Sequence, residues 1–216
     1  MSRHLVYFAH GEPAAIPAYA AALAAIGDVD IDIVLVRLEG KSSVYAQLGA
    51  DLRDTDSRVL PALRQRFPAP EPEEAYATLT LITYSAGYAL AREILAGAED
   101  RDALDAYVAL DSIHADLVDG AADAAQLAGF VTFAELAKDG DKTFWLGHSD
   151  VRTAGYASTT QVAARLLELT GGEGGGFVVR GFNVRAQDAS EHRAALFEWG
   201  PGFVAKALIS RLGSSS

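Results

Sequence analysis

Short apolar runs rich in β-branched residues alternate with longer segments of helical periodicity along almost the whole chain. This alternation predicts parallel strands joined by helices, because a parallel pair needs a long crossover and the helices then cover both faces of the sheet. We expect an α/β fold, a three-layer αβα sandwich with a mostly parallel sheet of about six strands. The predicted strands are residues 5–9, 31–36, 79–83, 106–110, 143–146 and 177–182, and the predicted helices are 14–26, 57–67, 88–96, about 121–137, 159–169 and 191–212.

Length and composition narrow the class of protein. The 216 residues fit a single α/β domain, which we place at residues 1–212, with a disordered tail at 213–216. A net charge of −11 argues against nucleic-acid binding, which needs clustered Lys and Arg. Because Cys is absent, disulfides, a thiolate nucleophile and a zinc–thiolate site are excluded. No signal-peptide pattern and no apolar run near the ~20 residues of a membrane span are visible, so we expect a cytoplasmic protein.

One junction between a predicted strand and a predicted helix stands out. The apolar run that begins at Leu79 stops at Thr83, and the chain turns through Ser85-Ala86-Gly87 into an alanine-rich helical pattern. A serine on such a sharp turn has its hydroxyl lifted clear of the sheet, beside the free N–H groups of the helix. Ala86 and Gly87 are small, as they must be where a larger side chain would collide with the neighbouring strand. The alternative interpretation is that Ser85 only caps the helix.

Polar residues gather where the predicted strands end. Because ligands bind beyond the carboxyl ends of the strands in open parallel sheets, this edge is where chemistry is expected. It contains four of the five histidines and two aspartates from the stretches that end the fourth and fifth strands: His10, Asp111, His114, His148, Asp150 and His192. A hydroxyl, an imidazole that removes its proton and a carboxylate that orients the imidazole are the groups that acyl transfer requires.

Together these motifs resemble the α/β-hydrolase superfamily in a small, minimal form, over about residues 4–210. His10-Gly11 is similar to its oxyanion loop, Tyr84 to Gly87 to its nucleophile elbow, and His192 stands where its general base is usual. The resemblance implies a Ser-Asp-His triad, with the N–H groups of Gly11 and Ala86 as the oxyanion hole. Two departures are Thr83, in place of the first glycine of G-x-S-x-G, and the absence of a leading pair of strands, so the fold would be truncated. The stretches 110–114 and 148–150 resemble one branch of the superfamily to which we attach no substrate.

Two aspartates are candidates for the carboxylate of the triad. Asp150 follows the fifth predicted strand, which is the commoner position in the superfamily, whereas Asp111 ends the fourth. We favour Asp111, because a buried orienting carboxylate requires the rigid placement that a strand end provides.

Other residues at this edge are candidates for substrate binding, namely His10, Tyr84, His114 and His148. Each has an alternative structural role: hydrogen bonding within a loop for the histidines, and packing against the sheet for Tyr84. The segment between the fourth and fifth strands, about 111–142, leaves room for one or two helices and so predicts at most a small lid.

We therefore expect a serine hydrolase that cleaves an ester of a small molecule or polymer through an acyl-enzyme, with no cofactor or metal. An amidase or peptidase with the same triad is the first alternative. A metal-dependent deacetylase that uses the histidines and aspartates of this edge is a second, although no established metal-ligand spacing is present. A binding protein that has kept a hydrolase fold is a third.

Overall fold

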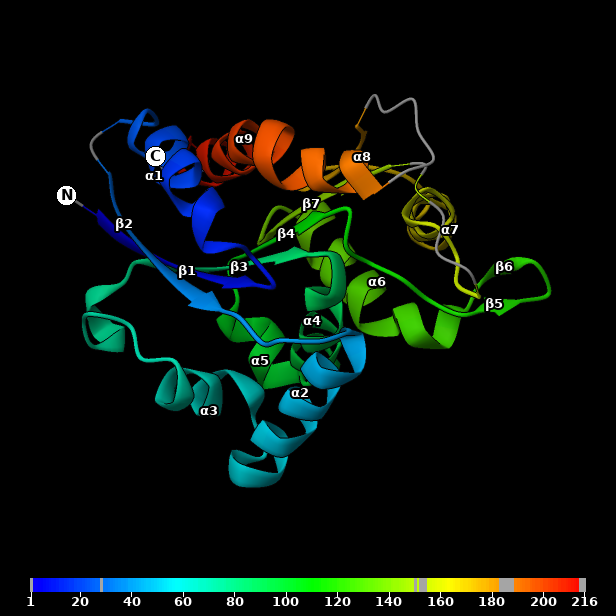
Figure 1. Ribbon diagram of the computed structural model, residues 1–216, viewed down its shortest axis with the longest axis horizontal. Helices are drawn as coiled ribbons and strands as arrows, with labels where there is room; N and C mark the ends of the chain where they lie inside the picture. Colours follow the sequence, from blue (N-terminus) through cyan, green and yellow to red (C-terminus); the bar gives the residue numbers. More distant parts are fainter. Residues whose placement is uncertain (1, 28, 150, 152–154, 183–188, 214–216) are drawn as a thin grey trace.

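The computed structural model describes residues 2–27, 29–149, 151, 155–182 and 189–213. Six strands form one sheet in the order β2-β1-β3-β4-β7-β8, and each pairs with its neighbours in parallel (Figure 1). The prediction of six parallel strands is confirmed. Their bounds are β1 (Ser2–Ala9), β2 (Val29–Val36), β3 (Thr78–Tyr84), β4 (Ala106–Leu110), β7 (Thr143–His148) and β8 (Phe177–Gly181).

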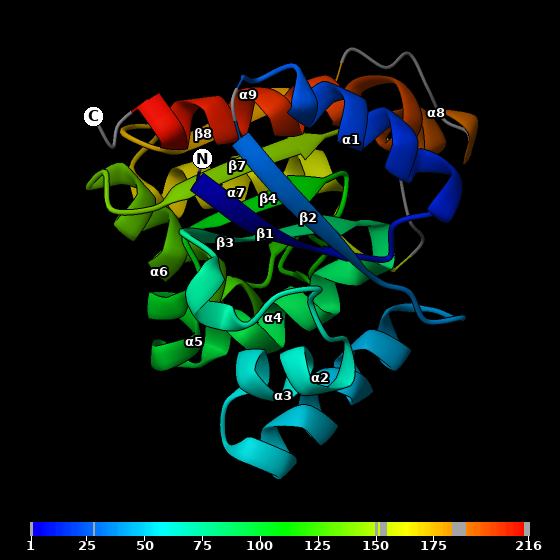
Figure 2. The same ribbon diagram turned by 90° about the vertical axis from the view of Figure 1, so that its left-hand side faces the viewer.

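Helices cover both faces of the sheet and complete the three-layer sandwich that was predicted (Figures 1 and 2). One layer contains α1 (Ile16–Ala24) and α9 (Gly200–Gly213), which α8 (Ala189–Ala194) and a π-helical turn (Ala195–Trp199) precede. The opposite layer contains α2 (Ser42–Asp56), α3 (Val59–Arg66), α4 (Tyr88–Ala96), α5 (Ala98–Ala103), α6 (Ala124–Lys138) and α7 (Thr159–Thr170). Among the residues described, no helix combines the length and the apolar character needed to cross a bilayer.

Alternating side chains of the central strands build a separate core on each face. On β1, Leu5 and Tyr7 pack toward the layer of α2 to α7, whereas Val6 and Phe8 pack toward α1 and α9. Burial on both faces explains why these strands show continuous apolar runs in the sequence rather than an apolar–polar alternation.

The direction of winding reverses between β1 and β3. From β1 the chain passes through α1, on one face, to β2; from β3 it passes through α4, on the other face, to β4 on the opposite side of β1. Adjacent strands whose connections leave to opposite faces form a topological switch point, where sheets of this kind bind ligands at the carboxyl ends of the strands. The topology therefore places the ends of β1 and β3 at the centre of any ligand site.

Helix α2 was not predicted, although the sequence carries its signal. Tyr45, Leu48, Gly49 and Leu52 are buried at helical spacing. The helix ends where Ser57 adopts a left-handed conformation (φ 53°), and α3 begins two residues later. The helix predicted at residues 57–67 therefore corresponds to α3, and α2 was not predicted.

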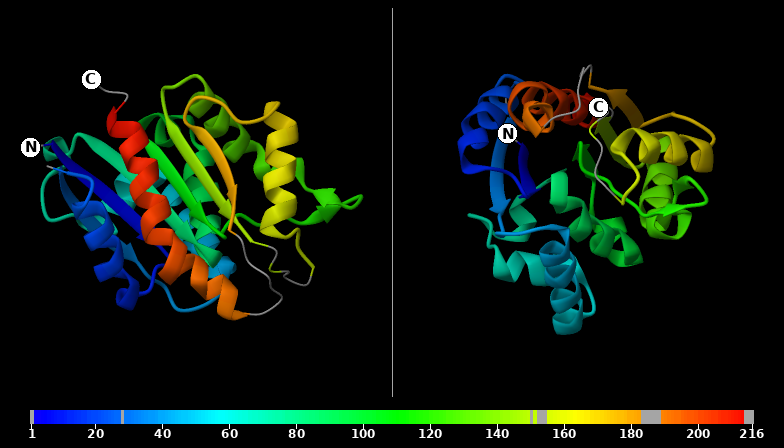
Figure 3. Two further views of the ribbon diagram at one scale, coloured as in Figure 1. Left: turned by 90° about the horizontal axis from the view of Figure 1, so that it is seen from above. Right: turned by 45° about the vertical axis from the view of Figure 1, so that its right-hand side comes forward.

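The segment between β4 and β7 contains one hairpin and one helix, which agrees with the small insertion expected there. The hairpin pairs β5 (Leu117–Val118) with β6 (Ala121–Ala122) and projects from the body of the molecule (Figure 3). Helix α6 begins after it, because the side chain of Asp123 accepts a hydrogen bond from the N–H of Ala125 and caps the helix. The predicted start of this helix, near residue 121, was therefore a few residues early.

Candidate active site

Ser85 lies on a sharp turn between β3 and α4. It is the first residue of a single 3-10 turn (Ser85–Gly87), and its φ of 47° is in the left-handed region, which costs energy for a residue with a Cβ. The capping positions of this turn and of α4 are Tyr84 and Gly87, and neither start has a capping hydrogen bond from a side chain. Ser85 is thus not the cap of the helix, and unlike the left-handed Ser57 it does not end a helix but stands between a strand and a helical turn.

Gly87 brings this turn against the end of the neighbouring strand. A Cβ atom on Gly87 would lie 2.5 Å from the carbonyl oxygen of Ala9, the last residue of β1, so only glycine fits without displacing that strand. This confirms the prediction that the turn requires a small residue there. The close approach also places the loop that begins at His10 and Gly11 beside the turn at Ser85.

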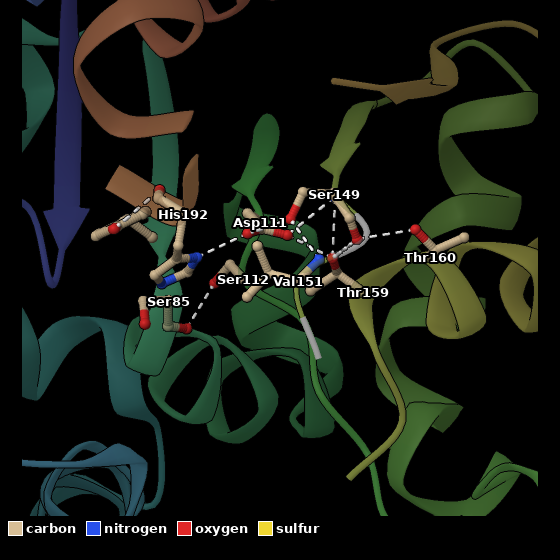
Figure 4. Close-up of polar contacts among 9 residues, drawn as sticks. Ser85, Asp111, Ser112, Ser149, Val151, Thr159, Thr160 and His192 are labelled. Carbon is tan, nitrogen blue, oxygen red and sulfur yellow. Dashed lines mark hydrogen bonds and ion pairs between the residues drawn. The ribbon is translucent and has the colours of Figure 1, made fainter. Parts of the chain in front are cut away.

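Asp111 and His192 are joined by a hydrogen bond. Asp111 directly follows β4, is 1% exposed, and its Oδ2 lies 2.7 Å from Nδ1 of His192 on α8 (Figure 4). Three further donors reach the carboxylate: the N–H of Ser149 at 3.0 Å, the hydroxyl of Ser149 at 2.7 Å, and the hydroxyl of Thr159. Each oxygen of the buried carboxylate therefore has hydrogen-bond partners.

These contacts determine the charge of Asp111 and the tautomer of His192. Burial opposes ionisation of Asp111, but the hydrogen bonds from His192, Thr159 and Ser149 outweigh it and lower the pKa of the carboxyl below its ordinary value. An ionised carboxylate only accepts, so Nδ1 of His192 carries the proton that it donates to Asp111. The other nitrogen of the His192 ring points toward Ser85 (Figure 4).

Tyr84 contacts His192 through both its ring and its hydroxyl. Its ring stacks on the His192 ring, with centroids 4.6 Å apart, and its hydroxyl donates to the carbonyl of His192 at 3.0 Å. The ring of His10 also stacks with Tyr84, at 6.1 Å, and its Nδ1 lies 3.1 Å from the hydroxyl of Tyr45. Burial, together with the nearby His192 and Arg37, lowers the pKa of His10, so its imidazole is neutral at pH 7.

Three predicted residues remain: His114, His148 and Asp150. The ring of His114 packs edge-on against Tyr88, with centroids 5.3 Å apart, and burial lowers the pKa of His114. Nδ1 of His148 lies 2.9 Å from the hydroxyl of Thr160 at the start of α7. Asp150 lies outside the described residues. Contact with substrate stays a prediction for all four candidates, His10, Tyr84, His114 and His148.

Ser149 and Thr159 contact Asp111 but were not among the predicted site residues. Both positions carried a partial signal: Ser149 follows β7 at the carboxyl edge, and Thr159 follows Ser158, whose side chain forms the capping box of α7 with Gln161. A helix cap at Ser158 accounts for a polar residue at this point of the sequence, so the neighbouring Thr159 carries no separate signal. Within the described part of the chain, no group of three or more His, Asp or Glu side chains has the arrangement of a metal site.

Solved structures of low sequence identity share this fold. An IroE-like serine hydrolase from Shewanella oneidensis matches with a TM-score of 0.54 and 16% identity, over 95% of this chain and 71% of that one. An esterase from Pyrococcus furiosus matches with a TM-score of 0.52 and 14% identity, over 96% of this chain and 82% of that one. A protein from Capnocytophaga ochracea matches at 0.58 and 9% identity over 96% of this chain, which spans 56% of its length. No family model and no curated protein matches the sequence. The likeness shows that this chain shares its fold with a serine hydrolase and an esterase.

The close approach at Gly87 yields a stability prediction. Gly87→Ala should lower the free energy of unfolding by about 1–3 kcal/mol, because the new methyl group would overpack against Ala9. Gly202→Ala on α9 is the matched control: a Cβ there meets no atom within 4 Å, so the change should be neutral or stabilise the helix by up to about 1 kcal/mol. Urea denaturation of both variants measures the difference, and a Gly87→Ala protein as stable as the wild type would contradict the packing described.

Proposed function

We propose that this chain is a serine hydrolase in which Ser85 is the nucleophile, His192 the general base and Asp111 the residue that orients the base. The observation that carries the proposal is the bond from His192 to the buried, ionised Asp111, with the opposite ring nitrogen directed at a serine on a strained turn (Figure 4). A histidine held in this tautomer can accept a proton only on Nε2, the nitrogen on the side of the ring toward Ser85.

The proposed reaction has two halves. Ser85 Oγ attacks the carbonyl carbon of the ester while His192 Nε2 takes the hydroxyl proton, and the N–H groups of Gly11 and Ala86 stabilise the oxyanion. The tetrahedral intermediate collapses, His192 returns the proton to the departing alkoxide, and an acyl group stays on Ser85. Water then attacks this acyl-enzyme with His192 as base, which releases the acid and restores Ser85.

The geometry supports the two proposed oxyanion donors. The N–H of Ala86 belongs to the first residues of a helical turn, whose N–H groups have no partner within the helix. Gly11 is in the loop that the contact between Gly87 and Ala9 brings beside this turn. Donors from the loops after β1 and β3 would converge on an oxyanion at the switch point.

An ester is the substrate class that we propose. The esterase of Pyrococcus furiosus, which shares the fold, supports this choice. The alternative substrate is an amide or peptide cleaved by the same three residues. No contact among the described residues favours this alternative or a non-catalytic binding role.

Covalent labelling tests the nucleophile. A fluorophosphonate probe should label the wild-type protein at Ser85, and Ser85→Ala should abolish the labelling, because the probe reacts with a serine activated by a neighbouring base. Peptide mapping by mass spectrometry identifies the labelled residue. Paired p-nitrophenyl esters and p-nitroanilides then distinguish the ester from the amide. Full labelling of Ser85→Ala at another residue would refute the assignment.

Two substitutions decide which carboxylate orients the base. Asp111→Asn should lower kcat by up to about 10,000-fold with little change in KM, because an amide cannot hold His192 in the required tautomer. Asp150→Asn should leave kcat within a few-fold of the wild type. Steady-state kinetics on one p-nitrophenyl ester compares the two variants. The opposite outcome, with loss of activity only in Asp150→Asn, would transfer the role to Asp150.

A further inference from the structure

A chain of buried hydroxyl groups connects strand β4 to the backbone of Ser85. The hydroxyls of Tyr107 and Thr83 lie 2.9 Å apart, those of Thr83 and Ser112 lie 2.8 Å apart, and Ser112 donates to the carbonyl oxygen of Ser85 at 3.0 Å. The side chains of Tyr107, Thr83 and Ser112 are fully buried. Ser112 is the donor in both of its contacts, so its one hydroxyl proton is shared between Thr83 Oγ1 and the Ser85 carbonyl, whereas either of Tyr107 and Thr83 can donate to the other.

This chain connects two of the three candidate-site residues that have a left-handed backbone, the third being His10 with a φ of 62°. Ser85, at the end of β3, has a φ of 47°, and Asp111, at the end of β4, has a φ of 46°. Ser112 is the residue after Asp111, and its contact with the Ser85 carbonyl appears in Figure 4. A backbone conformation of this kind persists only when the surrounding contacts impose it, and these hydrogen bonds supply such contacts.

Thr83 is the residue that departs from the G-x-S-x-G pattern. A glycine at this position would remove the hydroxyl that Tyr107 and Ser112 share, and the Tyr107 hydroxyl would lose its described partner inside the core, which is costly. We infer that Thr83 and Ser112 are positioning residues that act through the Ser85 carbonyl and hold the nucleophile in register with Asp111 and His192. The inference rests on the proposed role of Ser85 as nucleophile, and it assigns Thr83 and Ser112 no contact with substrate.

Thr80 provides an internal comparison on the same strand. It is fully buried like Thr83, but its hydroxyl finds no hydrogen-bond partner among the described residues. Removing that hydroxyl therefore breaks no hydrogen bond of the described structure. Thr80→Val is the matched control for Thr83→Val, because both substitutions replace a buried β-branched hydroxyl by a methyl group of similar size.

The test measures how fast Ser85 reacts. Thr83→Val should slow labelling of Ser85 by a fluorophosphonate by about 10- to 100-fold, and it should lower kcat on an ester by a similar factor. KM should stay nearly unchanged, because the substitution displaces the nucleophile and not the residues that bind the substrate. Ser112→Ala should have a similar effect without changing β3. Thr83→Ser, which keeps the hydroxyl, should restore most of the rate, and Thr80→Val should react as the wild type does. All rates are expressed per folded molecule, with the folded fraction measured by circular dichroism.

The outcomes separate this inference from the proposed function. If the wild type is labelled at Ser85 but Ser112→Ala reacts at the wild-type rate, the positioning inference is refuted and the nucleophile stands. A folded Thr83→Val that reacts at that rate, or a Thr83→Ser as slow as Ser112→Ala, refutes it equally. A Thr83→Val protein that does not fold leaves Ser112→Ala and Thr83→Ser to decide. A wild type that is never labelled at Ser85 refutes the proposed function, and the inference with it.

Discussion

The hydrogen bond between buried Asp111 and His192 is the interaction on which the rest of the candidate site depends. Moving a carboxylate out of water is costly unless its charge is paired and its oxygens accept hydrogen bonds. Here the donors come from three separate segments, at Ser149 before α7, Thr159 within it, and His192 on α8. The bond therefore ties α8 to the end of β4, and it sets the tautomer of His192.

Much of the fold could be predicted because its signals are local. The strand that contains Val108 is a short, wholly buried run because both faces are covered, and such a run is visible without knowing its neighbours. The strand that contains Leu81 is also buried, and β-branched threonines stand between its apolar residues. The turn at Ser85 was visible for the same reason, since its small residues are adjacent in the chain. Helix α2 was not predicted although Tyr45, Leu48 and Leu52 have helical spacing, which is a local signal of the same kind.

The contacts around Asp111 could not be predicted from local pattern. Ser149, Thr159 and His192 lie 38, 48 and 81 residues away from it in sequence, and each is common as a cap or loop residue. The same holds for Ser112, which reaches Thr83 across 29 residues. The sequence indicated that polar residues gather at one edge of the sheet, whereas the choice of partners depended on the lengths and register of the strands. Thr83 shows the consequence: in the sequence it weakens a motif, and in the structure it belongs to the hydrogen bonds around that motif.

The central claim is that Ser85, His192 and the N–H groups of Gly11 and Ala86 converge on one reacting centre. A crystal structure of the protein inactivated by a small alkyl phosphonate tests this most directly, because the bound group imitates the tetrahedral intermediate. The account predicts phosphorus bonded to Ser85 Oγ, with a phosphoryl oxygen within about 3 Å of the backbone nitrogens of Gly11 and Ala86. Phosphorus bonded to another residue, or a phosphoryl oxygen directed away from both nitrogens, would contradict it.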